Sequence, residues 1–427
     1  MPEFSVIGKP VQRMDALNKV LGRAEFSGDI KLPGMLEAKV LRSQVPHAVL
    51  RKINVWAAQA VPGVHAVLTA EDVPGSNSHG IVIKDEPVLV RDKIRKIGEP
   101  LAVIVAETGE VAQRAMELIE VELEVLPAVF KPEEAMMPDA PQVHAGGNIL
   151  LERKIRKGNV EEAFRQADIV VENTYRTQMA EHAYLEPEAG IAFLDGETVV
   201  VQVSTQNPHF DRKEVARNLA LPLNKVRVVQ APTGGGFGGK LDVSVQVHLA
   251  LAALRTKRPV RMVYSRQESL IASTKRHPLV IHYKTAADKT GKLLGVDVTL
   301  IGDTGAYASY GPATITRSAV HVTGPYEVPN VKIDAYAVYT NNPTAGAMRG
   351  FGVPQVAFAH EQQMDIVAEQ AGISPLQIRL LNALKAGSAT STGQILKSGV
   401  GVGTTIKAAQ AKAEQVLGQA YQGGPRP

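Results

Sequence analysis

The stretch VRVVQAPTGGGFGGKLD, residues 226–242, is the most informative part of the chain. Five glycines occupy six consecutive positions, 234–239, between a β-branched run and an apolar helical pattern. Glycine adopts positive φ at no steric cost and lets a ligand approach the backbone closely. The stretch therefore predicts a strand, a loop whose free N–H groups face an oxygen-rich ligand, and a helix. A tight turn that only joins the strand to the helix is the simpler alternative.

Two nucleotide-binding motifs fit this loop only in part. The loop satisfies G-x-G-x-x-G, but a dinucleotide-binding fold places that motif in its first βαβ unit and needs an acidic residue at the end of the next strand. Here the loop lies in mid-chain, and the next strand ends near Tyr264 without an acid. The loop also satisfies G-x-x-x-x-G-K up to Lys240, but Leu241 stands where a P-loop needs a hydroxyl for Mg²⁺. A P-loop-like nucleotide-binding module is therefore kept only as an alternative.

The composition excludes several classes of protein. The chain has 427 residues, enough for two or three domains. It has no cysteine, so it cannot hold a disulfide, a thiolate zinc site or a cysteine-ligated iron–sulfur cluster. The net charge of +4 is mild, and no basic run is interleaved with aromatics, so nothing indicates nucleic-acid binding. The start, MPEFSVIGKP, has no signal-peptide pattern and no apolar run is long enough to span a membrane, which predicts a cytoplasmic protein.

The pattern along the chain predicts an α+β fold in two parts. A strand–helix–strand pattern occupies residues 101–126, and Pro and Gly then accumulate over 127–147, as is typical of an interdomain connection. We therefore expect one domain at 1–145 and a second at 151–427. In the second part we expect two hairpins and a series of helices, at 191–203 and 279–301 for the hairpins and at 159–166, 211–219, 242–255, 354–372, 374–384 and 404–417 for the helices.

Three further motifs accompany the glycine loop. They are VSTQNPH at 203–209, TNNPTAGAMRGFGVPQ at 340–355, and the opening RMDALNKVLGRAEFSGDIKLPGMLEAKVLRSQVPHA at 13–48. Together with GGGFGGK they resemble the molybdenum-binding subunit of the xanthine oxidase and aldehyde oxidase family of molybdenum hydroxylases, over residues 8–384. The resemblance implies a small α/β hammerhead domain followed by the first part of a molybdopterin-binding domain.

The resemblance also implies an activity. Members of this family are oxidoreductases that hydroxylate a substrate with oxygen from water. The GKLD and RGFGVPQ sequences are most similar to those of members that hydroxylate nicotinate, an N-heteroaromatic acid, to 6-hydroxynicotinate. A purine (xanthine) or an aldehyde substrate is the alternative within the family. A non-catalytic scaffold that only holds the cofactor is a further alternative.

Cofactors and partners follow from the same resemblance. The implied cofactor is Mo-molybdopterin in its cytosine dinucleotide form, with molybdenum held by the pterin dithiolene and by no protein ligand. FAD and [2Fe-2S] clusters are expected on an FAD subunit and an iron–sulfur subunit of a hetero-oligomer. Family chains usually continue well beyond this length, and the polar sequence at 422–427 is interpreted as a natural end. We therefore expect a second molybdopterin subunit that supplies the C-terminal half and the general-base Glu, and no activity from this chain alone.

The resemblance assigns the cofactor contacts. Gln206 matches the glutamine that hydrogen-bonds the apical oxygen of molybdenum, and Phe237 and Gly238 match the Phe-Gly whose backbone lies against the metal ligands, so these three are the expected catalytic residues. From the residues alone, Gln206 would be an ordinary surface glutamine and Phe237 a packed loop aromatic. The full set of expected cofactor-binding residues is Gln206, Gly236, Phe237, Gly238, Ala347 and Arg349.

Three residues match positions of the substrate pocket. Phe351 would stack on an aromatic ring, and Arg317 would bind a carboxylate bidentately. Without the resemblance, Arg317 would be interpreted as a solvated arginine. Leu241 replaces the Glu that hydrogen-bonds the purine in xanthine-acting members. A pocket with an arginine, a phenylalanine and no acid favours an anionic aromatic such as nicotinate.

Overall fold

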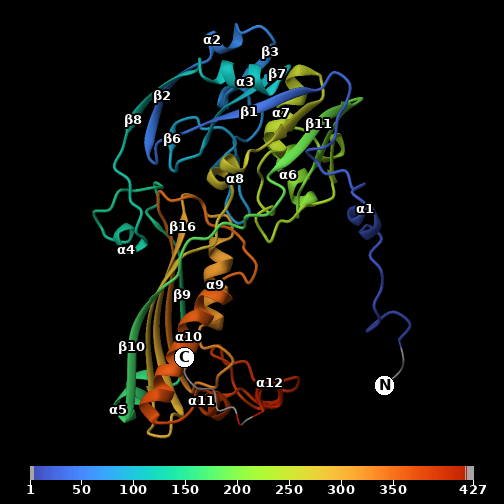
Figure 1. The fold of residues 1–427 in the computed structure, drawn as a ribbon. Coiled ribbons are helices and arrows are strands. Elements are labelled where there is room, and N and C mark those ends of the chain that lie inside the picture. Colours follow the sequence, from blue (N-terminus) through green and yellow to red (C-terminus); the bar gives the residue numbers. More distant parts are fainter. Residues whose placement is uncertain (1–3, 419, 421–427) are drawn as a thin grey trace.

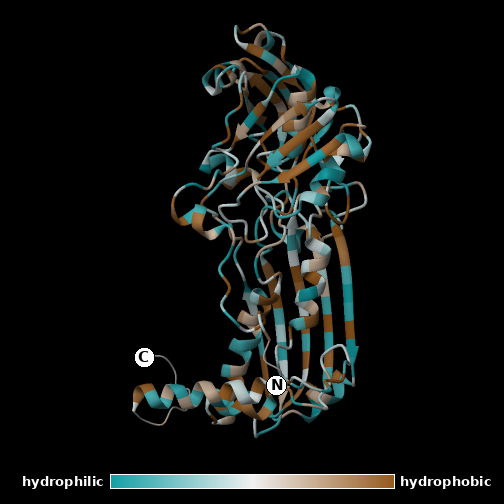
Figure 2. Ribbon diagram, turned by 90° about the vertical axis from the view of Figure 1, so that its right-hand side faces the viewer, coloured by the Kyte–Doolittle hydropathy of each residue, from teal (hydrophilic) through white to brown (hydrophobic). Residues whose placement is uncertain are grey.

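The computed structural model describes residues 4–418 and 420, so the polar sequence at 422–427 lies outside the described residues. The described part is elongated (Figures 1 and 2), with a large sheet at each end. Helices and strands are mixed along the chain, which confirms the predicted α+β class. Within the described residues, no helix is both long and apolar enough to cross a membrane.

A seven-stranded sheet forms the upper part in Figure 1. Its strands, in spatial order, are β13 (Val226–Gln230), β12 (Thr198–Val203), β11 (Ala189–Asp195), β14 (Val260–Val263), β1 (Leu36–Arg42), β7 (Pro100–Ala106) and β3 (Val64–Leu68). Strands β1 and β14 pair in parallel, with Leu36 opposite Val260, so the sheet continues across the expected boundary between 1–145 and 151–427. The predicted domain bounds stay a prediction, but the core around Leu36 and Leu249 is common to both parts.

The expected strand–helix–strand unit at 101–126 is confirmed. It consists of β7, α3 (Gly109–Met116) and β8 (Glu120–Val125). The Thr108 side chain accepts a hydrogen bond from Val111 N at 3.3 Å and so caps the helix. Strand β8 pairs with β2 (Ala48–Asn54), which pairs in turn with β6 (Lys93–Ile94) in a separate three-stranded sheet.

A five-stranded sheet forms the lower part in Figure 1. Its strands, in spatial order, are β10 (Ile169–Arg176), β15 (Leu279–Ala287), β16 (Leu293–Gly305), β17 (Asn330–Tyr339) and β9 (Ile149–Lys157). The β15–β16 hairpin was expected, and Asp288 Oδ1 fixes its turn by accepting from Thr290 N at 2.8 Å and Lys292 N at 3.0 Å. Helices α9 (Gly311–His321) and α10 (Val353–Ala371) pack on this sheet and share its apolar core.

Most helices lie where the sequence predicts them. α5 (Val160–Gln166) is capped by the Asn159 side chain, α10 has Pro354 in its first turn and ends at Gly372 with φ +67°, and a capping box between Ser374 and Gln377 begins α11 (Pro375–Asn382). The other predicted helices are α6 (Pro208–Asn218), α7 (Gln246–Thr256) and α12 (Val402–Leu417).

One predicted helix start is wrong. α7 begins four residues after Asp242, because the Asp242 carboxylate accepts a hydrogen bond from Ser309 Oγ at 2.8 Å and holds residues 242–245 in a loop. α7 is buried as expected and packs against β11 and β12.

Candidate functional site

The glycine loop, residues 231–242, joins the edge strand β13 to α7 and is packed closely by its own chain. A Cβ at Gly236 would lie 2.5 Å from Gln206 Oε1, and one at Gly239 would lie 2.8 Å from Tyr184 Cε1. Gly238, with φ +106°, has no room for a side chain because a Cβ would lie 2.5 Å from Ala347 O. The glycines are therefore required by contacts within the protein, whatever ligand the loop binds.

Close packing leaves only part of the loop backbone open. Gly234 N donates to Glu186 Oε2 at 2.7 Å, and Gly239 N donates to Gly236 O at 2.8 Å. Within residues 4–418 and 420, the N–H groups at 235–237 make no hydrogen bond. Among the five glycines and Phe237, the unbonded N–H groups are thus those of three consecutive residues, 235–237, of which Gly236 is buried.

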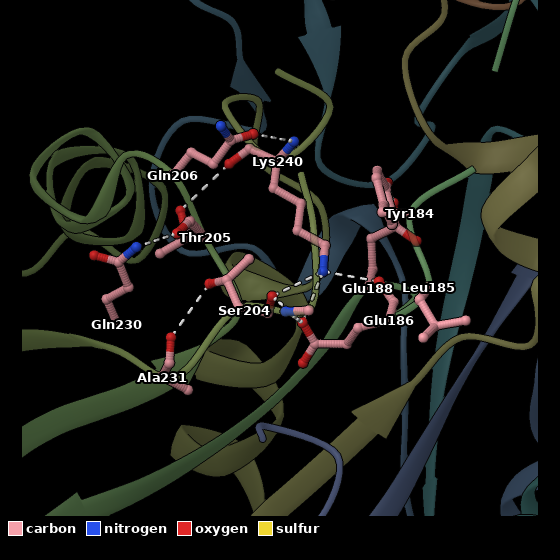
Figure 3. Close-up of polar contacts among 12 residues, drawn as sticks. Tyr184, Leu185, Glu186, Glu188, Ser204, Thr205, Gln206, Gln230, Ala231 and Lys240 are labelled. Atoms are coloured by element: carbon pink, nitrogen blue, oxygen red, sulfur yellow. Dashed lines mark hydrogen bonds and ion pairs between the residues drawn. The ribbon is translucent and has the colours of Figure 1, made fainter. Parts of the chain in front are cut away.

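Gln206 follows β12 and lies against this loop with a defined orientation (Figure 3). Its Oε1 accepts from Gly238 N at 3.0 Å and Lys240 N at 3.3 Å, and its own backbone N donates to Lys240 O at 2.9 Å. Gly238 N and Lys240 N are both donors, so the atom of the Gln206 side-chain amide that faces them is the oxygen. The Nε2 donor of this exposed residue points away from the loop and bonds to no described residue.

A second turn, residues 347–352, lies beside Phe237 and Gly238. Arg349 N donates to Phe237 O at 2.9 Å, and Ala347 O accepts from His182 Nε2 at 2.8 Å. Phe351 has φ +50° and stands between two glycines with positive φ, so the turn adopts a conformation that few other sequences allow. The turn therefore places the exposed Arg349 side chain next to the glycine loop.

Two of the three residues predicted for the substrate pocket, Arg317 and Phe351, lie next to each other. The Arg317 guanidinium lies 6.0 Å from the centre of the Phe351 ring, and the Tyr310 ring meets Phe351 edge-on at 5.7 Å. The side chain of Arg317 is exposed on α9 and forms no ion pair with any residue that the structure describes. Tyr310 was missed by the sequence analysis, although an aromatic directly before Gly311-Pro312 and one helical turn from the pocket motif was a usable signal.

Leu241 and Asp242 follow the glycine loop, and Asp242 is hydrogen-bonded to Ser309, next to Tyr310. Leu241 is half-buried, and its N donates to Gly238 O at 3.3 Å. Burial raises the pKa of Asp242 to about 7, while the hydrogen bond from Ser309 opposes that rise. Burial, and then the nearby Asp242 charge, raises the pKa of Tyr310 to about 12, so its hydroxyl stays protonated at neutral pH.

Lys240 points toward Glu186 and Ser204 (Figure 3). Its side chain is 1 % exposed, and its Nζ donates to Glu186 O at 2.8 Å, Glu186 Oε2 at 3.0 Å and Ser204 Oγ at 2.8 Å. These three acceptors use all three N–H groups of the ammonium. Burial lowers the pKa of Lys240, and Glu186 opposes that shift. A P-loop lysine must reach a phosphate, so this geometry argues against the P-loop alternative.

The open groups suit one kind of ligand. They are the N–H groups at 235–237 and the Gln206 Nε2, all neutral donors, with Arg349 beside them. A cofactor whose outer atoms are acceptors, and which carries its own metal ligands, fits such a set. Within the described residues, no group of three or more His, Cys, Asp or Glu side chains could itself hold a metal ion.

Comparisons with known proteins agree with these features. The molybdopterin cofactor-binding domain model matches residues 142–383. The a/b hammerhead domain model of aldehyde oxidase and xanthine dehydrogenase matches residues 21–127.

Individual relatives cover the chain to different extents. It is 51% identical over 417 residues to the nicotinate dehydrogenase large molybdopterin subunit of Eubacterium barkeri, which covers 97% of this chain and 98% of that protein. It is 42% identical to a probable xanthine dehydrogenase subunit of Bacillus subtilis strain 168, over 89% of this chain and 51% of that protein. The solved aldehyde oxidoreductase of Desulfovibrio desulfuricans has a TM-score of 0.92 at 30% identity, over 96% of this chain and 47% of that one. The chain therefore spans nearly all of one relative and about half of the others.

Proposed function

Because this chain belongs to the aldehyde oxidase and xanthine dehydrogenase family of molybdenum oxidoreductases, we propose that it is the N-terminal half of a split molybdopterin-binding catalytic subunit. We propose nicotinate as the substrate and 6-hydroxynicotinate as the product. The reaction replaces a ring C–H bond by C–OH, takes its oxygen from water, and releases two electrons and two protons. The relative that matches this chain over almost its full length is named for nicotinate.

The single observation that carries the substrate proposal is the placement of Arg317 over Phe351. The Arg317 guanidinium carbon lies 6.0 Å from the centre of the Phe351 ring, and the guanidinium forms no ion pair with any described residue. A guanidinium recognises a carboxylate through paired hydrogen bonds, and a ring stacks on Phe351. An aromatic carboxylate satisfies both groups at once. Leu241 adds no charge that would repel this carboxylate.

The proposed cofactor is Mo-molybdopterin, in its cytosine dinucleotide form. When bound, it supplies the transfer of oxygen from water to the ring carbon and accepts the electrons. Gln206 would donate through Nε2 to the cofactor, and the N–H groups at 235–237 would hold it from the loop. Gly236, Phe237, Gly238, Ala347 and Arg349 would form the wall against which it lies.

Further subunits complete the proposal. The chain has no cysteine and cannot ligate [2Fe-2S] clusters through thiolates, so the electrons would leave through an iron–sulfur subunit and an FAD subunit. A second molybdopterin subunit would supply the other half of the site, including a general-base Glu. The coverage of about half in the 42% identical relative supports such a division. The expected cytoplasmic location stays a prediction.

Turnover in ¹⁸O-labelled water tests the proposal. The native complex should convert nicotinate to 6-hydroxynicotinate that carries the label, and it should act on nicotinate faster than on xanthine. The isolated chain should show no turnover. Faster turnover of xanthine would contradict the substrate, and turnover by the isolated chain would contradict the split site.

A further inference from the structure

A buried ion pair ties both ends of the glycine loop to Glu186, in the same segment as Tyr184, which packs against Gly239. Glu186 Oε2 accepts from Gly234 N at 2.7 Å at the start of the loop and pairs with Lys240 Nζ at 3.0 Å at its end. The two side chains are 13 % and 1 % exposed. Ser204 Oγ donates to the same Glu186 oxygen at 2.7 Å. We call Glu186, Ser204 and Lys240 the loop clamp (Figure 3).

The loop clamp is connected to Gln206 on both sides. Ser204 precedes Gln206 by two residues in the same extended segment, and the backbone of Lys240 both donates to Gln206 Oε1 at 3.3 Å and accepts from Gln206 N at 2.9 Å. A shift of Lys240 therefore moves the groups that orient the Gln206 side-chain amide. The same shift moves Gly238 N, the other donor to Gln206 Oε1 at 3.0 Å.

Stability alone does not explain why a buried ion pair, Glu186 with Lys240, stands at this position. A buried ion pair loses hydration on both partners, and apolar replacements of similar size are often equally stable. The three acceptors around Lys240 Nζ come from two separate segments and fix its position in three dimensions. Tyr184, whose ring centre lies 4.7 Å from Nζ, closes the remaining side.

We propose that Glu186 and Lys240 are positioning residues, which hold the glycine loop so that Gln206 Nε2 and the N–H groups at 235–237 face the cofactor. They act through the loop and touch neither the cofactor nor the substrate. The inference rests on the proposed function only for its effect on turnover. Its effect on the loop itself can be measured in the chain without reference to any reaction.

The test removes both charges together. The Glu186→Gln/Lys240→Met variant removes both charges of the pair and keeps an oxygen that accepts from Gly234 N and Ser204 Oγ. The buried Glu188 carboxylate keeps its hydrogen bond from the Tyr184 hydroxyl, so the Tm should stay close to that of the wild type. The control variant is Arg42→Met/Glu268→Gln, which removes another largely buried pair, with a 3.0 Å contact, that does not touch the loop. Both variants are made in the native complex with the full chain.

Two measurements decide the outcome. In the clamp variant, amide hydrogen exchange of the peptide that contains 234–241 should be about tenfold faster or more, because the loop opens without global unfolding. Turnover per bound molybdenum should fall about tenfold or more, with a much smaller change in KM, because a misplaced donor acts on the reaction step. The control variant should match the wild type in both.

Several results would overturn the inference. Wild-type loop exchange in the folded clamp variant would show that the pair does not position the loop. A Lys240→Met variant that loses turnover, while the double variant regains it, would show that the pair acts only through the cost of an unpaired charge. A wild-type complex that lacks molybdenum would contradict the proposed function instead, and the exchange measurement would still decide the role of the clamp.

Discussion

Lys240 and Arg317 are two cations beside the same group of loops, but they differ in burial and in the number of protein acceptors around them. Lys240 is buried, and three protein acceptors use all its N–H groups. Arg317 is exposed, forms no ion pair with a described residue, and has its guanidinium 6.0 Å from the centre of the Phe351 ring. A cation can bind a ligand only with donors that the protein has left unused. The side of the site at Lys240 therefore holds the loop in place, and the side at Arg317 and Phe351 is the one that can receive a substrate.

The same contrast applies to the glycine loop itself. One side of it is filled by Tyr184, Glu186 and Ala347, which leave no room for a Cβ at Gly234, Gly235, Gly238 and Gly239. The other side has the unbonded N–H groups at 235–237, with Gly236 itself buried, and the Gln206 Nε2. The glycines of the loop are therefore needed mainly for close packing within the protein. A ligand can contact only the groups that this packing leaves unbonded.

Removal of the Gln206 donor should give the largest effect on the open side. In the native complex, Gln206→Ala should lower kcat by about 10²–10³, the usual cost of losing one donor to developing negative charge, while molybdenum content falls much less. Steady-state kinetics and metal analysis measure both. Gln44→Ala, at another exposed glutamine, is the matched control and should leave both unchanged. An unchanged kcat in Gln206→Ala would make Gln206 an ordinary loop residue.

Arg317 should be next, and its effect should depend on the charge of the substrate. Arg317→Met should raise KM for nicotinate about tenfold or more, since a lost hydrogen bond between charged groups costs roughly 1.5–3 kcal/mol. KM for the neutral analogue nicotinamide should change much less. Arg114→Met, at an exposed arginine of α3, should affect neither substrate. An equal rise in KM for nicotinate and nicotinamide would show that Arg317, like Lys240, does not bind the carboxylate of the substrate.

Leu241→Glu should sharpen the same distinction from the opposite direction. An anion near the Arg317 pocket should raise KM for nicotinate several-fold, roughly the cost of one like charge across a solvated gap. The variant should gain relative activity on xanthine, whose ring N–H groups can donate to the new carboxylate. Competition between the two substrates measures the change. A lower KM for nicotinate would show that Leu241 lies outside the pocket.

The smallest expected effect is on stability, at Asp242. Its pKa is raised to about 7 by burial, so the neutral form is favoured in the folded protein. A carboxyl with a raised pKa contributes its stability below its ordinary pKa and loses it as pH rises through the raised value. The Tm of the wild type, minus that of Asp242→Asn, should therefore fall by roughly 3 °C between about pH 5 and pH 8. A difference that is constant with pH would contradict the raised pKa.

The sequence predicted what depends on neighbouring residues. The β15–β16 hairpin follows from alternation around a turn with Asp288, and α10 follows from Pro354 and Gly372 at its two ends. The motifs predicted Gln206, Phe237, Arg317 and Phe351, and the structure places them around one group of loops. Their roles stay predictions.

What the sequence did not predict depends on contacts between distant residues. Glu186 lies 54 positions before Lys240, and no local pattern indicates that they pair. The pairing of β1 with β14, which sets Leu36 opposite Val260, is also a contact between distant residues that no local pattern indicates. Asp242 was placed in a helix because its neighbours are apolar, whereas its hydrogen bond to Ser309 decides its conformation.

Molybdenum analysis of the native complex tests the central claim most directly. If the open face of the glycine loop receives molybdopterin, the purified complex should contain about one molybdenum per copy of this chain, because the cofactor carries the reaction chemistry that no side chain here supplies. The pterin, released by acid, should be found in the same ratio. A catalytically competent complex that contains no molybdenum would contradict the claim.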